Sequence, residues 1–215
     1  GNTPKQSADS FINNWAGLWG FDSKDLLPVG PWGGGNHIQP IMFDHSTQSY
    51  KFTGIGYMQT YQGVPIYNSR ITILVRNEEG FPAVHVTSDL YNVKRWNLDE
   101  GKPSSKIVTS VLNKRFGQSA SFSKPVFVVF AGFEGDRRDP ALAYVSEVQR
   151  GSKMLGTFEK YRLIIDAKTG EILHSDDLIL HNVDGQVTAN VTQGAAADEC
   201  EIELPLPMQY AKVSG

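Results

Sequence analysis

Apolar residues near the start of the chain recur at a helical spacing. Phe11, Trp15, Leu18 and Trp19 fall on one face of a helix that the pattern predicts over residues 7–19, with Ser7 as its N-cap. The following stretch, residues 28–36, is so rich in Gly and Pro that it predicts a loop. The first element is therefore an amphipathic helix that needs an apolar partner.

From Ile38 to Val93 the spacing changes to short apolar alternations separated by turn residues. This pattern predicts an antiparallel meander. Within it Ile71, Ile73 and Val75 alternate with more polar positions, so one face of the sheet is expected to be apolar. We expect the amphipathic helices to cover that face.

The helical spacing returns in residues 103–116, with Pro103 near the start of the predicted helix and Gly117 just after its end. Further strand patterns follow, and residues 167–170, Ala-Lys-Thr-Gly, predict a hairpin turn. The order helix, strands, helix, strands predicts an α+β fold in two similar halves, each a helix with an antiparallel sheet.

The change of pattern along the chain predicts its division into domains. The first half covers residues 5–98 and the second covers residues 99–181. Residues 182–215 contain a Val-rich segment, a stretch of small residues and a Pro-containing segment, and they predict the start of a further small β module or a linker segment. The chain begins without Met and ends in a strand-like segment, so we interpret it as a processed or cut piece.

Composition narrows the possible functions. The net charge is −3, and basic residues are scattered, which argues against a nucleic-acid or polybasic membrane role. No apolar run approaches the roughly 18 residues of a membrane span. The single cysteine, Cys200, excludes an internal disulfide framework and a multi-thiolate zinc site.

No catalytic constellation stands out. The five histidines form no H-E-x-x-H motif, there is no G-x-S-x-G nucleophile motif, and Cys200 lies in an acidic segment that would raise its thiol pKa. His174 with Asp176 and Asp177 could bind a cation, although a solvated strand end is the favoured interpretation. Residues 134–139, "EGDRRD", are interpreted as a hairpin tip. We therefore predict a binding or folding module, not an enzyme, with no cofactor and no metal of its own.

The stretch "QTYQGVPIY", residues 59–67, breaks an otherwise continuous strand pattern, since Gly weakens a strand interior and Pro cannot donate a ladder hydrogen bond. With its flanking strands, it resembles the fungalysin/thermolysin propeptide (FTP) family. That resemblance implies a motif and interaction site at Gln59, Tyr61, Gly63, Val64, Pro65 and Ile66. We interpret residues 63–65 as a tight connection that lets two strands pair and then change direction.

Farther along, "YRLIIDAKTGEIL" is similar to the PepSY-type second half of such propeptides and implies Asp166 and Gly170 as further motif residues. Residues 182–215 depart from that pattern, because a catalytic domain would follow the propeptide in those peptidases. Together the two resemblances cover roughly residues 5–181.

The resemblance implies a non-catalytic pro-region of an exported zinc metallopeptidase, which acts as an intramolecular chaperone and inhibitor in the zymogen. The partner would be a thermolysin- or fungalysin-like peptidase domain in cis or in trans, and zinc would belong to that domain alone. The protein would be secreted or held in the cell envelope, after removal of a signal peptide. The alternative is a stand-alone secreted or surface module of the same fold that binds or inhibits without a protease in cis.

Overall fold

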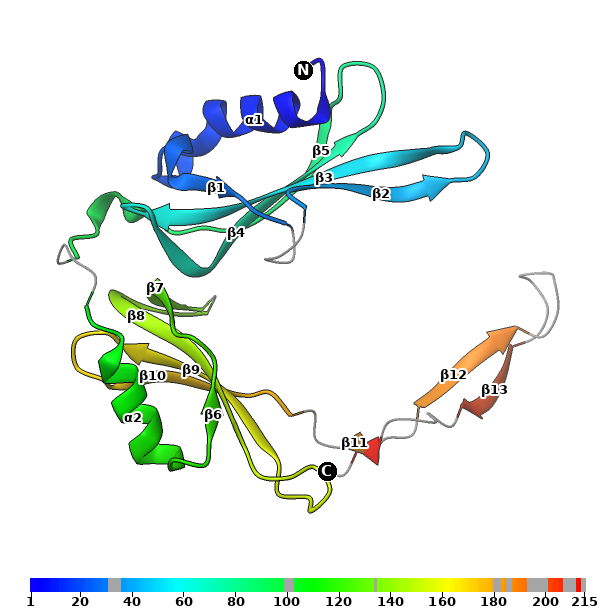
Figure 1. The fold of residues 1–215 in the computed structure, drawn as a ribbon. Helices are drawn as coiled ribbons and strands as arrows, with labels where there is room; N and C mark the ends of the chain where they lie inside the picture. Colours follow the sequence, from blue (N-terminus) through cyan, green and yellow to red (C-terminus); the bar gives the residue numbers. More distant parts are fainter. Residues whose placement is uncertain are drawn as a thin grey trace. The chain divides into compact units, whose positions relative to one another are not determined.

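The computed structural model describes residues 1–30, 36–98, 103–133 and 135–179, together with the backbone of four short strands between residues 183 and 213. The chain forms two compact units, residues 1–176 and residues 177–215. The described residues of the first unit form two α-helices and one large, mostly antiparallel sheet of ten strands (Figure 1). The predicted α+β class is therefore confirmed at this level.

Helix α1, Pro4–Trp19, begins earlier than its apolar pattern predicted. Thr3 is the N-cap, and its hydroxyl accepts a hydrogen bond from the backbone N–H of Gln6 at 3.2 Å. Pro4 fits the first helical position because a proline lacks the N–H that would have no partner there. The predicted cap at Ser7 is wrong, since Thr3 and Pro4 supply a stronger start signal three residues upstream.

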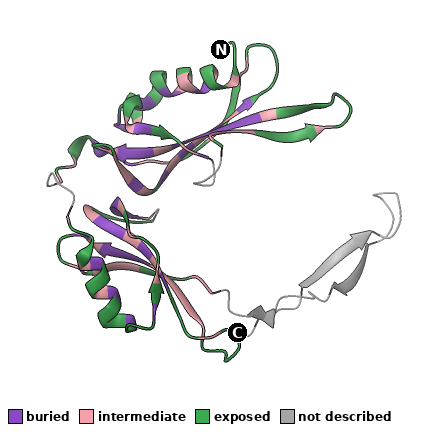
Figure 2. Cartoon of the chain, in the orientation of Figure 1, coloured by how far each residue is buried: buried purple, intermediate pink, exposed green. Residues whose placement is uncertain are grey.

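The buried face of α1 matches the prediction only in part, since Phe11 and Trp19 pack against the core but are not its buried centre. Ala8, Ile12 and Ala16 are buried, whereas Trp15 and Leu18 are 48% and 76% exposed (Figure 2). Small alanines allow the helix to approach the sheet closely, so the bulky residues lie along its flank or in solvent. The apolar spacing correctly predicted a helix, but it wrongly predicted that Trp15 and Leu18 would lie on its buried face.

The strands of the first half form the predicted meander. Strand β3 pairs with both β1 and β2, and the order β2, β3, β4, β5 is antiparallel throughout. Ile71, Ile73 and Val75 of β4 are fully buried, as predicted, in a core that includes the buried residues of α1. The elements are η1 Ser23–Asp25, β1 Leu26–Pro28, β2 Ile38–Asp44, β3 Ser49–Tyr61, β4 Val64–Arg76, β5 Ala83–Asp89 and η2 Val93–Arg95.

The second half places α2, Lys106–Phe116, against a sheet of its own strands. Val108, Leu112 and Phe116 of α2 are buried, and its C-cap is Gly117, directly after the end that the sequence predicted. The strands are β6 Ser121–Phe122, β7 Val126–Phe133, β8 Asp136–Arg150, β9 Glu159–Asp166 and β10 Ile172–Asp177. Strands β7 and β8 form an antiparallel hairpin whose end lies within residues 134–139, as predicted, but β8 begins at Asp136, so Arg137 and Arg138 already belong to the strand.

The turn between β9 and β10 lies at residues 167–170, as the sequence indicated. The Asp166 carboxylate accepts hydrogen bonds from the backbone N–H groups of Lys168 and Thr169, at 2.8 and 2.6 Å. Gly170 takes a positive φ of 75° and lies close to α2, where an added Cβ would come within 3.1 Å of Ile107. Both residues thus hold the turn against the helix.

The two halves of the first unit meet where β4 pairs with β7. This parallel pairing has a single registered pair, Ile66 with Val129, yet Val129 and Ala131 are buried in the core cluster of the first half.

In the second unit the described strands form two short antiparallel pairs, β11 Val183–Asp184 with β14 Lys212–Val213 and β12 Val187–Thr192 with β13 Glu201–Leu206. The division of the first unit near residue 98 stays a prediction. Cys200 and Trp32 lie outside the described residues.

Candidate binding site

The break in the strand pattern at residues 62–65 contains a two-residue hairpin turn. Gln62 and Gly63 both have positive φ, 51° and 78°, and Tyr61 pairs directly with Val64. Two successive positive φ values are typical of the type I′ turns that match the twist of paired strands. The connection is therefore Gln62–Gly63 and not residues 63–65, because Val64 and Pro65 already pair within β4.

Immediately after Pro65, strand β4 leaves its partner β3. The register passes from Thr60 paired with Pro65 to Met58 paired with Arg70, so the residues 66–69 of β4 stand opposite Gln59 alone. Asn68, within this bulge, has a positive φ of 62°. The bulge turns β4 toward the second half, and Ile66 pairs there with Val129.

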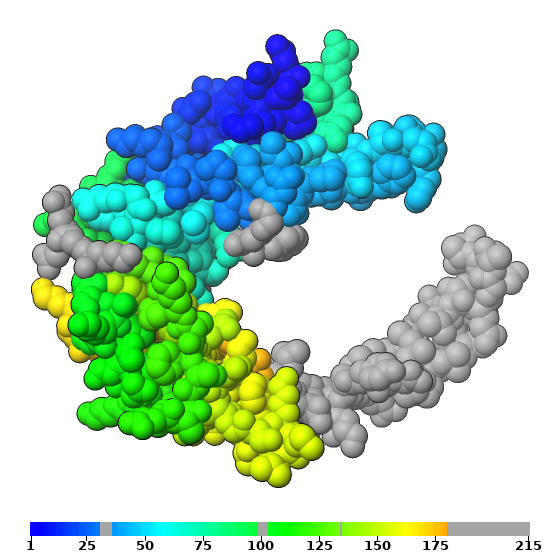
Figure 3. Space-filling model, in the orientation of Figure 1, coloured from blue at the N-terminus to red at the C-terminus, as the bar shows by residue number. Residues whose placement is uncertain are grey.

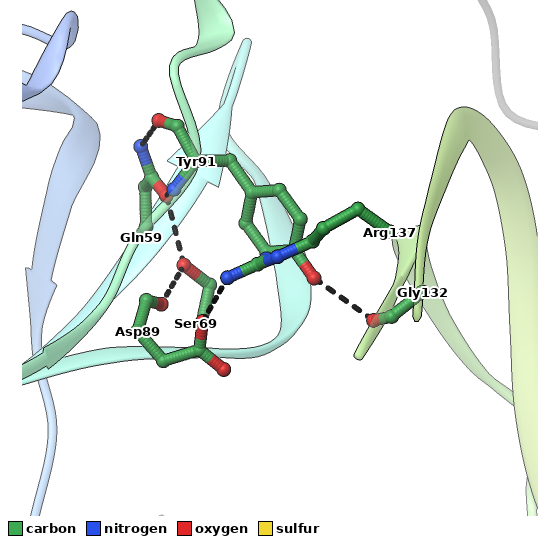
Figure 4. A network of polar contacts seen from close by, with 6 residues as sticks. All are labelled: Gln59, Ser69, Asp89, Tyr91, Gly132 and Arg137. Carbon is green, nitrogen blue, oxygen red and sulfur yellow. Dashed lines mark hydrogen bonds and ion pairs between the residues drawn. The ribbon is translucent and has the colours of Figure 1, made fainter. Parts of the chain in front are cut away.

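The side chain of Gln59 fills the gap in hydrogen bonding that the bulge leaves. Its Nε2 donates to the carbonyl of Tyr91 at 2.8 Å, and its Oε1 accepts from the Tyr91 backbone N–H at 2.9 Å and from the Ser69 hydroxyl at 2.8 Å (Figure 4). Gln59 is fully buried. Its amide thus acts like an inserted peptide group that satisfies otherwise unpaired backbone groups.

Tyr91 continues this network into the second half. Its hydroxyl donates to the carbonyl of Gly132 at 2.8 Å, and the Arg137 guanidinium lies 3.8 Å from the centre of its ring (Figure 4). Arg137 also forms an ion pair with Asp89. Burial raises the pKa of the Tyr91 phenol, which keeps the hydroxyl protonated as a donor. We call the six residues drawn in Figure 4 the joint.

The sheet of the first half has a second face that no helix covers within the described residues. Strand alternation places Arg70, Thr72 and Leu74 on the side of β4 opposite to the buried Ile71 and Ile73. We call this side the open face. It contains an open groove of about 650 Å³. The groove is lined by Gln39, Ile41, Asn68, Arg70, Thr72, Leu74, His85, Thr87, Ser88 and Asp89.

The groove contains one cation without a counter-ion. Arg70 is half-buried and has no ion-pair partner among the described residues. Asp89 stands directly opposite Arg70 in the β4–β5 ladder, but its carboxylate pairs with Arg137 of the second half. Because the joint engages Asp89, the guanidinium of Arg70 is available to a ligand.

The remaining predicted residues make structural contacts. The hydroxyl of Tyr61 donates to the Trp96 carbonyl at 2.9 Å, and the two rings lie 5.6 Å apart. His174 Nε2 contacts Asp176 Oδ1 at 2.6 Å. Within the part of the chain that the structure describes, no three His, Cys, Asp or Glu side chains gather in a group that could hold a metal ion.

Sequence reasoning missed every residue of the joint except Gln59, and it also missed Arg70. Tyr91 and Arg70 carry no motif signal, and Arg137 was part of the segment interpreted as a hairpin tip. The only available signal for Arg137 was the Pro140 that follows it. A proline inside a strand marks a bulge, and the β7–β8 register does shift between Phe130 and Gly132.

Comparison with known proteins identifies similarity to a solved structure but to no family model. No family model matches the chain, and no curated protein matches it. Among solved structures it is similar to the Bacillus megaterium YpeB C-terminal domain, at 16% identity and a TM-score of 0.38. The alignment covers 82% of this chain and 64% of that one. In the described residues, no helix is long and apolar enough to cross a membrane.

Proposed function

We propose that this chain is a non-catalytic pro-region of an exported zinc metallopeptidase, which it helps to fold and then inhibits through its open face. The observation that carries the proposal is the groove on a sheet face that no helix of the described chain covers. A half-covered sheet with a polar groove and exposed apolar neighbours is suited to bind another polypeptide.

The arrangement of the motif residues supports the same proposal. Gln59 of the FTP-like motif holds the bulge of β4, and the bulge borders the groove through Asn68 and Arg70. A change in the motif would therefore alter the groove as well as the stability of the fold. The resemblance and the groove involve the same segment of the chain.

The proposal includes a division of the chain into an FTP-like half, residues 5–98, and a PepSY-like half, residues 99–181, of similar plan. In support, each half packs one amphipathic helix against one face of antiparallel strands. Asp166 and Gly170 of the second motif fix the β9–β10 turn against α2.

The chaperone role has a simple physical basis. A peptidase domain rich in contacts between distant residues folds slowly, because chain entropy is lost before those contacts form. A preformed sheet face that binds part of that domain lowers this barrier, and the same contact then blocks the substrate cleft. Zinc and the catalytic residues would belong to the peptidase domain, and export would place both in the cell envelope or outside the cell.

One observation favours a second candidate, a stand-alone binding or inhibitor module that acts in trans. The strands of residues 177–215 pair with each other and form a compact unit of their own. Such a unit is suited to a modular surface protein.

A refolding experiment tests the proposal. A thermolysin-like peptidase without its own pro-region is denatured and diluted into buffer with or without the 215-residue chain, and recovered activity is measured after removal of the chain. The same chain is then titrated against the native peptidase. We expect a several-fold gain in recovered activity and inhibition at micromolar concentrations, both weakened by the open-face substitution Leu74→Asp.

The matched control is Val84→Asp, an exposed position on β5 that does not line the groove. It should behave as the unchanged chain. If the peptidase encoded with this chain is neither refolded nor inhibited, the proposed function is wrong.

A further inference from the structure

We propose that the groove of the open face binds an extended acidic peptide segment, with a carboxylate held by the guanidinium of Arg70. The inference rests on the proposed function in one respect, that the segment belongs to the polypeptide that the open face binds. It adds the chemical group of the segment that is bound, a carboxylate, and the residue that binds it, Arg70.

The charge of the groove selects a carboxylate. Arg70 and Asp89 are its formally charged residues, and the Asp89 carboxylate already accepts from Arg137. A half-buried guanidinium without a counter-ion has lost part of its hydration and gained no ion pair in return. A ligand carboxylate can accept two parallel hydrogen bonds from the planar guanidinium. Thr72 and Thr87, adjacent in the β4–β5 ladder, offer hydroxyl groups beside it.

The apolar neighbours of the groove indicate a polypeptide instead of a small acid. Ile41 lines the groove and lies over Gly54, where an added Cβ would meet its Cδ1 at 2.7 Å. Strand alternation continues this face of β2 to Phe43, whose ring contacts Tyr50 at 5.1 Å. Ile41 and Phe43 are 37% and 41% exposed, and Figure 3 shows the end of the β2–β3 hairpin, in light blue, standing clear of neighbouring atoms.

An extended segment matches this pattern. Alternate side chains of a strand point to the same side, roughly 7 Å apart, so an acidic residue at position i places residues i−2 and i+2 over the same surface. Leu74 lies four residues beyond Arg70 on β4, and Ile41 lies on β2 toward the same end of the groove. With the carboxylate on Arg70, an apolar residue on one side of the acidic residue can pack toward Leu74 and Ile41. A segment with apolar residues both two positions before and two positions after the acidic residue offers this contact in either chain direction.

Two peptides with blocked ends test the inference. The first is Ser-Val-Ser-Glu-Ser-Val-Ser, and the second has Gln in place of Glu. Each is titrated into the isotopically labelled chain, and the dissociation constant is measured from NMR shifts of the Arg70 side-chain Nε–H and the backbone amides of β4 and β5. We expect the Glu peptide to bind about tenfold more tightly, the effect of one charge-assisted contact.

Variants separate Arg70 from general electrostatics. Arg70→Gln should remove the preference for Glu, and Arg70→Lys should keep part of it, since a lysine keeps the charge but not the fork. The control is Arg76→Gln, on the same face of β4 and outside the groove, where the preference should stay near tenfold. NMR spectra of each variant show whether its fold is retained.

The inference is overturned if the unchanged chain binds both peptides equally, or if folded Arg70→Gln still prefers Glu. If the proposed function is wrong and the inference is right, the Glu peptide binds through Arg70, but the chain neither refolds nor inhibits the peptidase. Inhibition that survives Arg70→Gln unchanged would likewise leave the function in place and overturn the role of Arg70.

Discussion

The buried amide of Gln59 on β3 connects strand β4 with the segment that follows β5. It bonds to both backbone groups of Tyr91 and accepts from Ser69 where the β3–β4 ladder is interrupted. A buried polar group that loses its partner costs about 1–3 kcal/mol. We predict that Gln59→Ala lowers the free energy of unfolding by about 2–4 kcal/mol, measured by urea denaturation, because both Tyr91 groups lose their partner.

Gln39→Ala is the matched control. Gln39 lies on neighbouring strand β2 and has no side-chain hydrogen bond within the described chain, so its replacement should change stability by less than about 0.5 kcal/mol. Equal effects of the two substitutions would show that the Gln59 amide is not structural.

The sequence identified Gln59 as a motif residue but could not predict its role. Its partner, Tyr91, lies 32 residues farther along the chain, and nothing in the local pattern pairs them. Arg137 and Asp89 are separated by 48 residues in the same way. Residues whose contacts are local were predicted well, as at Asp166, which bonds only two and three residues ahead.

Two glycines with positive φ, Gly63 in a turn and Gly132 in strand β7, allow a prediction at the level of secondary-structure elements. Their φ angles are nearly equal, 78° and 82°, but an added Cβ at Gly63 meets nothing within 4 Å, whereas at Gly132 it would meet the Asp136 carbonyl oxygen. We predict that Gly63→Ala costs about 1 kcal/mol from the unfavourable φ alone. Gly132→Ala should cost at least about 3 kcal/mol, because the backbone of the β7–β8 hairpin must also shift.

The measurement is thermal and urea unfolding of both variants under one set of conditions. Gly63→Ala serves as the internal control for backbone strain, so the difference reports the crowding at Gly132. A similar cost for both would show that β7 and β8 yield easily around that position.

At the same level, the sequence predicted the kind of each element better than its orientation. The meander, the helix ending before Gly117 and the buried row at Ile71 to Val75 follow from spacing that the fold keeps. The orientation of α1 does not follow from the spacing of its apolar residues. Close packing on the sheet buries the small Ala8 and Ala16 and leaves Trp15 and Leu18 exposed. The groove could not be predicted either, since it depends on which face of the sheet lacks a helix.

For the first unit as a whole, we predict that the joint makes its two halves unfold together. The direct contacts at the joint are one hydroxyl bond, from Tyr91 to Gly132, and the contacts of Arg137 with Asp89 and the Tyr91 ring. All four tryptophans lie between residues 15 and 96, so their fluorescence reports on the first half alone. Far-ultraviolet circular dichroism, in contrast, reports on the strands and helices of both halves.

We predict that the unchanged chain shows coincident fluorescence and dichroism transitions in urea, whereas the double variant Tyr91→Phe with Arg137→Gln shows separated ones. The free energy of unfolding of the variant should also fall by about 2 kcal/mol, because it loses the hydroxyl hydrogen bond, the cation–π contact and a solvent-weakened ion pair. Tyr50→Phe with Arg76→Gln removes an exposed hydroxyl and an exposed guanidinium, and its transitions should stay coincident. Coincident transitions in the joint variant would mean that the apolar contact around Ile66 and Val129 couples the halves, and the polar network would then serve mainly to keep Asp89 away from Arg70.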